Sequence, residues 1–158
     1  MEKKLRIGLV GVGGMGRTHS SCWAKNDRVV MVALCDLIPE RCERAIEMYH
    51  FEGAKVYTDF KEMIDKEQLD AVDIATPNNL HSIIAVYAFE HGLHVFSEKP
   101  DAINAVEQKK MKDAAEKAGK VLMVMRNNRY YTNSQYLKKY IADGKAGEIY
   151  CGRCGWIR

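Results

Sequence analysis

Residues 5–16 read LRIGLVGVGGMG, an apolar run that passes directly into a glycine-rich turn. The first six residues have the length and composition of a buried β-strand, and residues 14–24 continue with a helical pattern. A six-residue glycine pattern on its own arises easily by chance. Its place between a strand and a helix makes it specific, because that is the setting in which such a turn binds a dinucleotide.

Each glycine of this turn has a physical role. Gly11 allows the tight turn, Gly13 lets the main chain approach a pyrophosphate, and Gly16 allows the helix to pack closely on the strand. The free N–H groups at the start of the helix, at Gly14 and Met15, face the phosphates together with the positive end of the helix dipole. We therefore predict that these five residues bind the pyrophosphate of a nicotinamide cofactor.

Asp36 lies twenty residues beyond Gly16, at the end of a second apolar strand at residues 29–35. A carboxylate at this place accepts both hydroxyls of the adenosine ribose and repels a 2′-phosphate. The sequence therefore predicts NAD as the cofactor and disfavours NADP. Two plainer interpretations stay open: Asp36 as a turn residue before a helix, and Arg41 as a residue of a solvated helix face. If Arg41 lies beside Asp36, it softens the preference for NAD.

Strands and helices alternate along the first 125 residues. Further strands are expected at residues 55–57, 71–75, 94–97 and 121–125, and helices at residues 39–49, 60–64, 82–91 and 105–118. Continuous apolar strands that alternate with helices indicate a parallel sheet covered on both faces. Right-handed crossovers make such a sheet doubly wound. The predicted fold is therefore an α/β Rossmann domain over residues 1–125.

The pattern changes after Met125. Thr132 and Gln135 have the spacing of a capping box at the start of a helix, and residues 149–157 read as a strand. A lone helix and strand cannot close a second core, and an unpaired terminal strand invites aggregation. We therefore expect residues 126–158 to be the start of an α+β second domain that this chain does not complete.

The composition is that of an ordinary globular protein. The 158 residues are 47% hydrophobic and 28% charged, with a formal net charge of +3. These values argue against disorder and against a nucleic-acid or membrane-surface partner. No apolar run has the length that spans a bilayer, and the first residues lack the pattern of a signal peptide. We therefore expect a cytoplasmic protein.

The five cysteines are expected to be free thiols, because their number is odd and no export signal is recognised. Cys151 and Cys154 have the spacing of a redox or zinc half-site. No second pair of cysteines or histidines with ligand spacing accompanies them, and in a strand an offset of three places the two side chains on opposite faces. No metal site is predicted.

Three motifs carry a resemblance to a known family: GVGGMGRTH at residues 11–19, ATPNNLH at residues 75–81 and HVFSEKP at residues 94–100. In this order they resemble the oxidoreductases of the Gfo/Idh/MocA family, which includes inositol, glucose–fructose and other sugar dehydrogenases. NNRY at residues 127–130 and DGKAGEI at residues 143–149 look like the family's entry into its second domain. The resemblance implies an NAD-dependent oxidoreductase that transfers a hydride between nicotinamide and a secondary hydroxyl or carbonyl of a sugar, cyclitol or related polyol.

The resemblance also implies roles around the nicotinamide. Thr76, Pro77 and Asn78 would form the loop beneath that half of the cofactor, and His81 would support the loop. Glu98 would contact the nicotinamide ribose.

At the reacting centre, Lys99 would reach the oxygen of the reacting carbon, and Pro100 would follow a cis peptide bond. Asn128 would lie at the boundary between cofactor and substrate. For His19, the sequence leaves open an approach to the cofactor and a packed or surface imidazole.

The role of Lys99 has physical support of its own. Hydride transfer from an alcohol needs a partner for the hydroxyl proton. A lysine at the carboxyl end of a parallel strand projects into the crevice where such sheets bind ligands. We therefore predict that Lys99 is the catalytic residue. Asp101 departs from the family's pattern, which has an apolar residue there; it either pairs with Lys99 or faces water.

The family's second domain would supply an Asp and a His that complete the proton relay, and an open sheet through which dimers or tetramers form. We therefore expect this chain to bind the cofactor without turnover of its own. Two alternatives stay open. One is a non-catalytic NAD-binding module with a sensing or association role. The other is a methyltransferase, which also joins a glycine-rich turn to an acid after the second strand, although the EKP motif argues against it.

Overall fold

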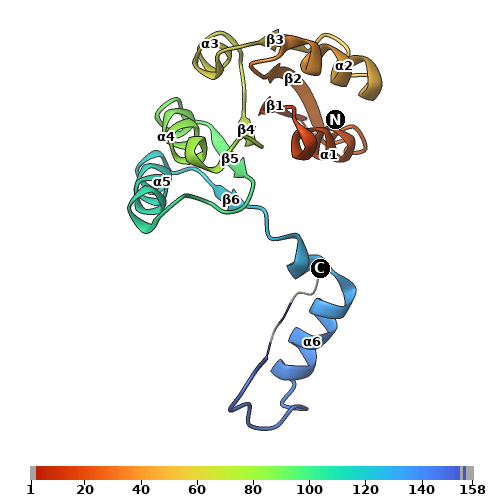
Figure 1. Ribbon diagram of the computed structural model, residues 1–158, viewed down its shortest axis with the longest axis vertical. Helices are drawn as coiled ribbons and strands as arrows, with labels where there is room; N and C mark the ends of the chain where they lie inside the picture. Colours follow the sequence, from red (N-terminus) through yellow and green to blue (C-terminus); the bar gives the residue numbers. More distant parts are fainter. Residues whose placement is uncertain (1–2, 154, 156–158) are drawn as a thin grey trace. The chain divides into compact units, whose positions relative to one another are not determined.

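The computed structural model describes residues 3–153 and residue 155, which belong to two compact units, residues 1–125 and residues 126–158. The first unit is a six-stranded parallel sheet in the order β3-β2-β1-β4-β5-β6 (Figure 1). The predicted doubly wound Rossmann fold is confirmed. The strands are β1 (Leu5–Val10), β2 (Val29–Cys35), β3 (Lys55–Tyr57), β4 (Ala71–Ile74), β5 (His94–Ser97) and β6 (Leu122–Val124).

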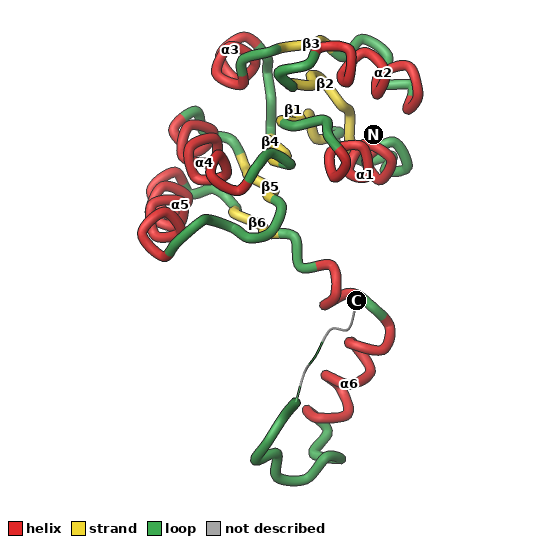
Figure 2. Tube along the Cα trace, in the orientation of Figure 1, coloured by secondary structure: helices red, strands yellow, loops and turns green. Residues whose placement is uncertain are grey.

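Helices cover both faces of this sheet, as Figures 1 and 2 show. One face is covered by α1 (Gly14–Trp23) and α2 (Pro39–Tyr49), and the other by α3 (Phe60–Lys66), α4 (His81–Glu90) and α5 (Ala105–Ala118). Each face has its own buried apolar cluster. Leu9 and Leu34 are fully buried beneath α2, and Phe89 is buried on the opposite side. Each such side chain stabilises the fold by about 2 kcal/mol.

Local signals set the helix ends. Pro39 is the first residue of α2, where its missing N–H costs nothing. Asn104 caps α5 by accepting a hydrogen bond from Glu107 N at 2.9 Å, and Gly119 ends that helix with a left-handed φ of 62°. Because these ends are fixed, the loops that leave the strands have defined lengths.

The register places the strand ends in one row. Val10 of β1 pairs with Cys35 of β2 and Ile74 of β4, and Ile74 pairs in turn with Ser97 of β5. Since all strands are parallel, every loop that follows a strand starts at the same edge of the sheet. That edge is where ligands bind in open α/β folds.

The second unit contains η2 (Asn127–Tyr130) and α6 (Thr132–Ala142). Two expectations are wrong here. Tyr131, and not Thr132, takes the N-cap position of α6 without a side-chain hydrogen bond, and Gln135 Nε2 donates to the carbonyl of Arg129 instead. The capping box fails because Thr132 is already helical.

The strand expected at residues 149–157 is also wrong for residues 149–153 and 155, which have no regular structure. A strand needs a hydrogen-bonded neighbour, and the described part of this unit contains no other strand. Residues 154, 156 and 157 lie outside the described residues.

Candidate cofactor and active site

The main chain joins the predicted motifs at the carboxyl edge of the sheet. Hydrogen bonds continue the ladder one step beyond the strands: Ala75 N donates to Val10 O at 2.8 Å, and Glu98 N donates to Ile74 O at 2.9 Å. The glycine-rich turn, the loop after β4 and the segment after β5 therefore begin side by side.

The four glycines of the turn fall into two kinds. A Cβ on Gly11, which has a φ of +91°, would lie 2.6 Å from the carbonyl oxygen of Ala75, and a Cβ on Gly16 would lie 1.9 Å from the carbonyl oxygen of Gly11. The protein's own packing therefore requires glycine at both positions. A Cβ on Gly13 or Gly14 would meet no described atom within 4 Å. These two residues leave open space at the start of α1, as a phosphate cradle requires.

Positive charge lies beside this cradle. A cavity of about 250 Å³ is lined by Gly13 and Gly14 together with Arg17, Arg41 and Arg44. The N-terminus of α1 adds the positive end of its dipole, and its N-cap residue is a glycine without a side chain to satisfy the free N–H groups. The charge and the free donors suit a pyrophosphate.

Asp36 fastens the glycine-rich turn to the end of β2. One carboxylate oxygen accepts a hydrogen bond from Val12 N at 2.7 Å, and the other accepts from Ile38 N at 3.0 Å and lies 3.4 Å from the Arg41 guanidinium. The sequence did not indicate this fastening. Arg41 is not simply solvated, because its guanidinium lies beside Asp36. The carboxylate keeps acceptor capacity for a ribose hydroxyl, since each of its oxygens has two lone pairs.

The loop after β4 contains an unsatisfied hydroxyl. Among the described residues, Thr76 Oγ1 is the buried side-chain atom that has no hydrogen-bond partner. It borders a cavity of about 740 Å³ whose lining also includes Gly11, Asp36 and Pro77. A buried hydroxyl without a partner costs about 1–3 kcal/mol. A polar ligand in this cavity would recover that energy.

His81 ties this loop to the segment after β5. The residue is fully buried at the start of α4. Its Nε2 lies 2.9 Å from the carbonyl oxygen of Thr76, and its Nδ1 lies 2.8 Å from the carbonyl oxygen of Pro100. The Lys99–Pro100 peptide bond is cis, as the resemblance implied.

The other predicted residues lie around this edge or in the second unit. Lys99 is exposed after β5, and Met15, Pro77 and Asn78 are exposed beside the turn and the loop. Asn128 lies in η2 of the second unit. Asp101 accepts a hydrogen bond from Gln108 of α5.

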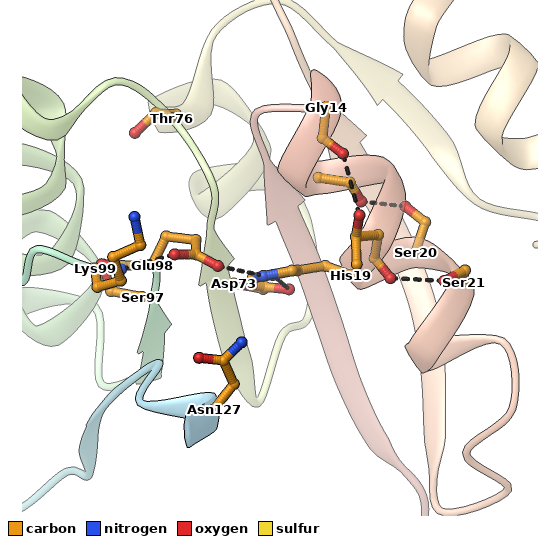
Figure 3. A network of polar contacts seen from close by, with 12 residues as sticks. Gly14, His19, Ser20, Ser21, Asp73, Thr76, Ser97, Glu98, Lys99 and Asn127 are labelled. Carbon is orange, nitrogen blue, oxygen red and sulfur yellow. Dashed lines mark hydrogen bonds and ion pairs between the residues drawn. The ribbon is translucent and has the colours of Figure 1, made fainter. Parts of the chain in front are cut away.

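Glu98 belongs to a buried row of side chains that the sequence did not predict (Figure 3). His19 of α1 contacts Asp73 of β4 through Nδ1 at 2.9 Å and Glu98 through Nε2 at 3.1 Å. Trp23 Nε1 donates to Asp73 at 2.6 Å, and one oxygen of Glu98 accepts from Lys99 N at 2.9 Å.

A signal for this row is present in the sequence, because Asp73 interrupts the apolar run of a buried strand and a buried carboxylate needs partners. Burial by itself lowers the pKa of His19, but its hydrogen bonds to Asp73 and Glu98 and their negative charges outweigh burial and raise the pKa above 6.5.

The described residues contain neither a metal-binding cluster nor a membrane-spanning helix. Within residues 3–153 and 155, no group of three or more His, Cys, Asp or Glu is arranged to hold a metal ion. No helix in the same residues has both the length and the apolar character needed to cross a membrane. Cys22, Cys35, Cys42 and Cys151 are free, and Cys154 lies outside the described residues.

The residues of the edge fit a dinucleotide. A phosphate or a carboxamide that leaves water needs new hydrogen-bond or charge partners in the pocket. Such partners are offered by the open cradle at Gly13 and Gly14, the neighbouring arginines and the unpartnered Thr76 hydroxyl.

Known proteins with similar sequences include sugar dehydrogenases. Levoglucosan dehydrogenase of Pseudarthrobacter phenanthrenivorans is 36% identical over 155 residues, which cover 93% of this chain and 39% of the relative. D-glucoside 3-dehydrogenase of Escherichia coli is 31% identical over 162 residues, which cover 96% of this chain and 46% of the relative. The chain thus spans about two fifths of the length of such relatives.

Solved structures agree. Scyllo-inositol dehydrogenase of Lactobacillus casei, crystallised with NAD(H) and scyllo-inositol, matches with a TM-score of 0.86 and 27% identity over 93% of this chain and 43% of that protein. The sequence profile described as "Oxidoreductase family, NAD-binding Rossmann fold" matches residues 5–126, about three quarters of the chain. That match leaves no support for the methyltransferase alternative, and it shows that the chain belongs to the Gfo/Idh/MocA oxidoreductase family.

Proposed function

We propose that this chain is the cofactor-binding part of an NAD-dependent oxidoreductase that acts on a secondary hydroxyl or carbonyl of a sugar, cyclitol or related polyol. The observation that carries the proposal is the junction of the glycine-rich turn, the Thr76 loop and the Glu98–Lys99 segment at one edge of the sheet. The substrates in the names of the relatives support the polyol class.

The turn and Asp36 hold the adenosine half of NAD in this proposal. Main-chain N–H groups at Gly13, Gly14 and Met15 bind the pyrophosphate, with Gly11 and Gly16 shaping the turn. Asp36 accepts a ribose hydroxyl with its remaining lone pair, on the oxygen that also accepts from Val12 N.

The edge holds the nicotinamide half. Thr76, Pro77 and Asn78 form the floor under the ring, and the Thr76 hydroxyl gains a partner there. His81 keeps this floor attached to the Lys99–Pro100 segment, and Glu98 lies nearest the nicotinamide ribose. Bound NAD supplies the hydride acceptor.

Lys99 manages the proton. Its Nζ hydrogen-bonds the substrate oxygen; as the neutral amine it takes the hydroxyl proton while the alcohol is oxidised, and as the ammonium it returns that proton in the reverse reduction. Because the side chain is exposed at the carboxyl edge, it can reach a substrate that enters from solvent. Asn128 belongs to the boundary between cofactor and substrate in this proposal.

Residues 126–158 are proposed to begin the substrate domain of a longer, homo-oligomeric protein. The greater length of the relatives supports this assignment. The same proposal includes a cytoplasmic location and no nucleic-acid or membrane partner. The free thiols of Cys35 and Cys42 fit a reducing compartment, and the near balance of charge fits a small-molecule ligand.

Cofactor binding is tested by titrating the chain with NADH and following energy transfer from the tryptophans to the bound nicotinamide. We expect saturable binding that NAD competes with. The absence of any binding would overturn the proposal.

Catalysis is tested on the longer protein, by turnover of a polyol panel with NAD, because this chain is expected to bind the cofactor without turnover of its own. Lys99→Met should lower turnover at least about 100-fold and change NADH affinity little, whereas Lys112→Met, on the exposed face of α5, should leave both unchanged. NADH binding without turnover of any polyol by the longer protein would favour the non-catalytic module.

A further inference from the structure

The buried row beneath the edge has more acceptors than a neutral histidine can serve. Asp73 and Glu98 present carboxylates to opposite sides of the His19 ring, at 2.9 Å and 3.1 Å. A neutral imidazole has one N–H, so one ring nitrogen would turn its lone pair toward a carboxylate. An imidazolium donates to both. The distances therefore require a proton on each ring nitrogen when both carboxylates are ionised.

Because the row is buried, the second proton on His19 is needed to pair the two carboxylates. The His19 and Asp73 side chains are 2% and 0% exposed, and the Glu98 side chain is 7% exposed. Two carboxylates removed from water carry a high cost unless they are paired. Among the residues that the structure describes, the donors that reach these carboxylates are His19, Trp23 Nε1 and Lys99 N. In the same residues, Asp73 and Glu98 are the charged groups that face the His19 ring. One imidazolium between two carboxylates leaves the row with a single net negative charge.

The row ends on the main chain that carries the proposed catalytic amine. Glu98 uses one carboxylate oxygen for His19 and the other for Lys99 N. In Figure 3 the Lys99 side chain leaves this row on the side where Thr76 lies. The carboxylate thus fixes the backbone of Lys99 and leaves its amine free to meet a substrate.

We propose that His19 is a positioning residue that remains an imidazolium between Asp73 and Glu98, and that it holds the Glu98 carboxylate in place and, through it, the main chain of Lys99. The consequence for hydride transfer rests on the proposed function of Lys99. The charge state and the hold on the Lys99 main chain do not, and both are measurable without any cofactor.

The charge state is measured by NMR on the protein with ¹⁵N-labelled histidine. Two ring N–H signals from His19 near neutral pH are expected. A single N–H and an unprotonated ring nitrogen would overturn the proposal. Folding raises the pKa of His19, so the imidazolium stabilises the folded protein fully at pH values below the pKa of the unfolded chain. The free energy of unfolding of the wild type relative to His19→Gln should therefore decline as pH rises above neutrality.

The hold on Lys99 is measured by hydrogen exchange of its amide. In His19→Gln the amide N–H can still donate to Glu98, but Asp73 loses the donor that the imidazole supplied and faces the amide oxygen or no partner. We expect exchange at Lys99 to rise at least tenfold more than at Val72, which reports general loosening of the sheet. The matched control is His91→Gln, which removes a histidine that lies 3.3 Å from Asp65 at the surface and should leave Lys99 protected.

A rescue separates positioning from bulk stability. With Asp73→Asn added to His19→Gln, the amide at position 73 can donate to the amide oxygen at position 19, whose own N–H donates to Glu98. No charged imidazole is then needed, so protection at Lys99 should return. Equal exchange at Lys99 in wild type and His19→Gln would refute the proposal.

A catalytic readout follows. If His19→Gln lowers kcat at least tenfold with little change in KM, and the double variant restores it, the positioning reaches the reaction. Failure of the wild type to bind NADH would count against the proposed function alone, because the exchange and NMR results do not depend on it.

Discussion

Replacing Gly16 with alanine tests whether this glycine of the turn is needed for packing, whereas Gly13 is needed for cofactor binding. The new Cβ would lie 1.9 Å from the carbonyl oxygen of Gly11, and real Cβ contacts essentially never fall under 3.0 Å. Because that neighbour is backbone, the start of α1 must move away from β1 by about 1 Å. Forced overpacking of this kind costs about 1–3 kcal/mol and occasionally more, while alanine returns up to about 1 kcal/mol of helix propensity.

Because backbone must move, the cost is taken at the upper end, about 3 kcal/mol, and the expected net loss for Gly16→Ala is about 2 kcal/mol, or a fall in Tm of roughly 8 °C for a unit of this size. Gly13→Ala is the matched variant. A Cβ there meets nothing within 4 Å, and its φ of −73° suits alanine. We expect its Tm to stay within about 2 °C of wild type.

NADH affinity should distinguish Gly13→Ala from the wild type, although its thermal stability does not. Gly13→Ala fills space proposed for the pyrophosphate, so its affinity should fall at least tenfold although the fold is intact. The assay is a thermal melt of each variant followed by NADH titration well below Tm. A Gly16→Ala protein as stable as wild type would refute the packing argument, and a Gly13→Ala protein with full affinity would refute the cradle.

Three further outcomes are expected. Asp36→Ser should lower the preference for NAD over NADP at least tenfold, measured as a ratio of dissociation constants, because it removes the charge that repels a 2′-phosphate; an unchanged ratio would contradict this role. Burial raises the pKa of Cys35 and of Cys42 to about 12. A thiol reagent near pH 8 should therefore label the exposed Cys22 quickly and label Cys35 and Cys42 only when the protein unfolds. Mass spectrometry of the labelled peptides measures this difference. Hydrogen bonds from Arg6 N of β1 and from the Lys3 ammonium hold the pKa of Asp70 below its usual 3.8. The stabilisation from this carboxylate is therefore present above pH 3.8 and is lost as pH falls through the lower pKa of the folded protein. Acid unfolding of Asp70→Asn should be less steep than that of the wild type, and identical acid unfolding curves would contradict the shift.

The fold was predictable because its signals are local. A few consecutive residues are enough to recognise the strand from Leu5 to Val10, the glycine-rich turn and the strands before Asp36, Thr76 and Glu98. Parallel pairing then brings their ends to one edge without any knowledge of side-chain contacts.

The buried row was not predictable in the same way. Asp73 could be recognised as a charge inside an apolar strand, but its partner His19 lies 54 residues earlier. Many polar residues could have met it, and only the packing of α1 on β4 selects one. The failed strand at residues 149–157 has a related cause, because a strand forms with a neighbour and the sequence of one segment does not supply it.

The contacts of His81 carry a lesson for protein engineering. This side chain fastens the loop after β4 to the turn after β5 through two carbonyl groups. A graft that imports a relative's loop at residues 76–80 alone would keep one end of that bridge and change the geometry of the other. Exchanges of specificity in this scaffold should therefore transplant residues 76–81 and residues 97–101 as a single cassette.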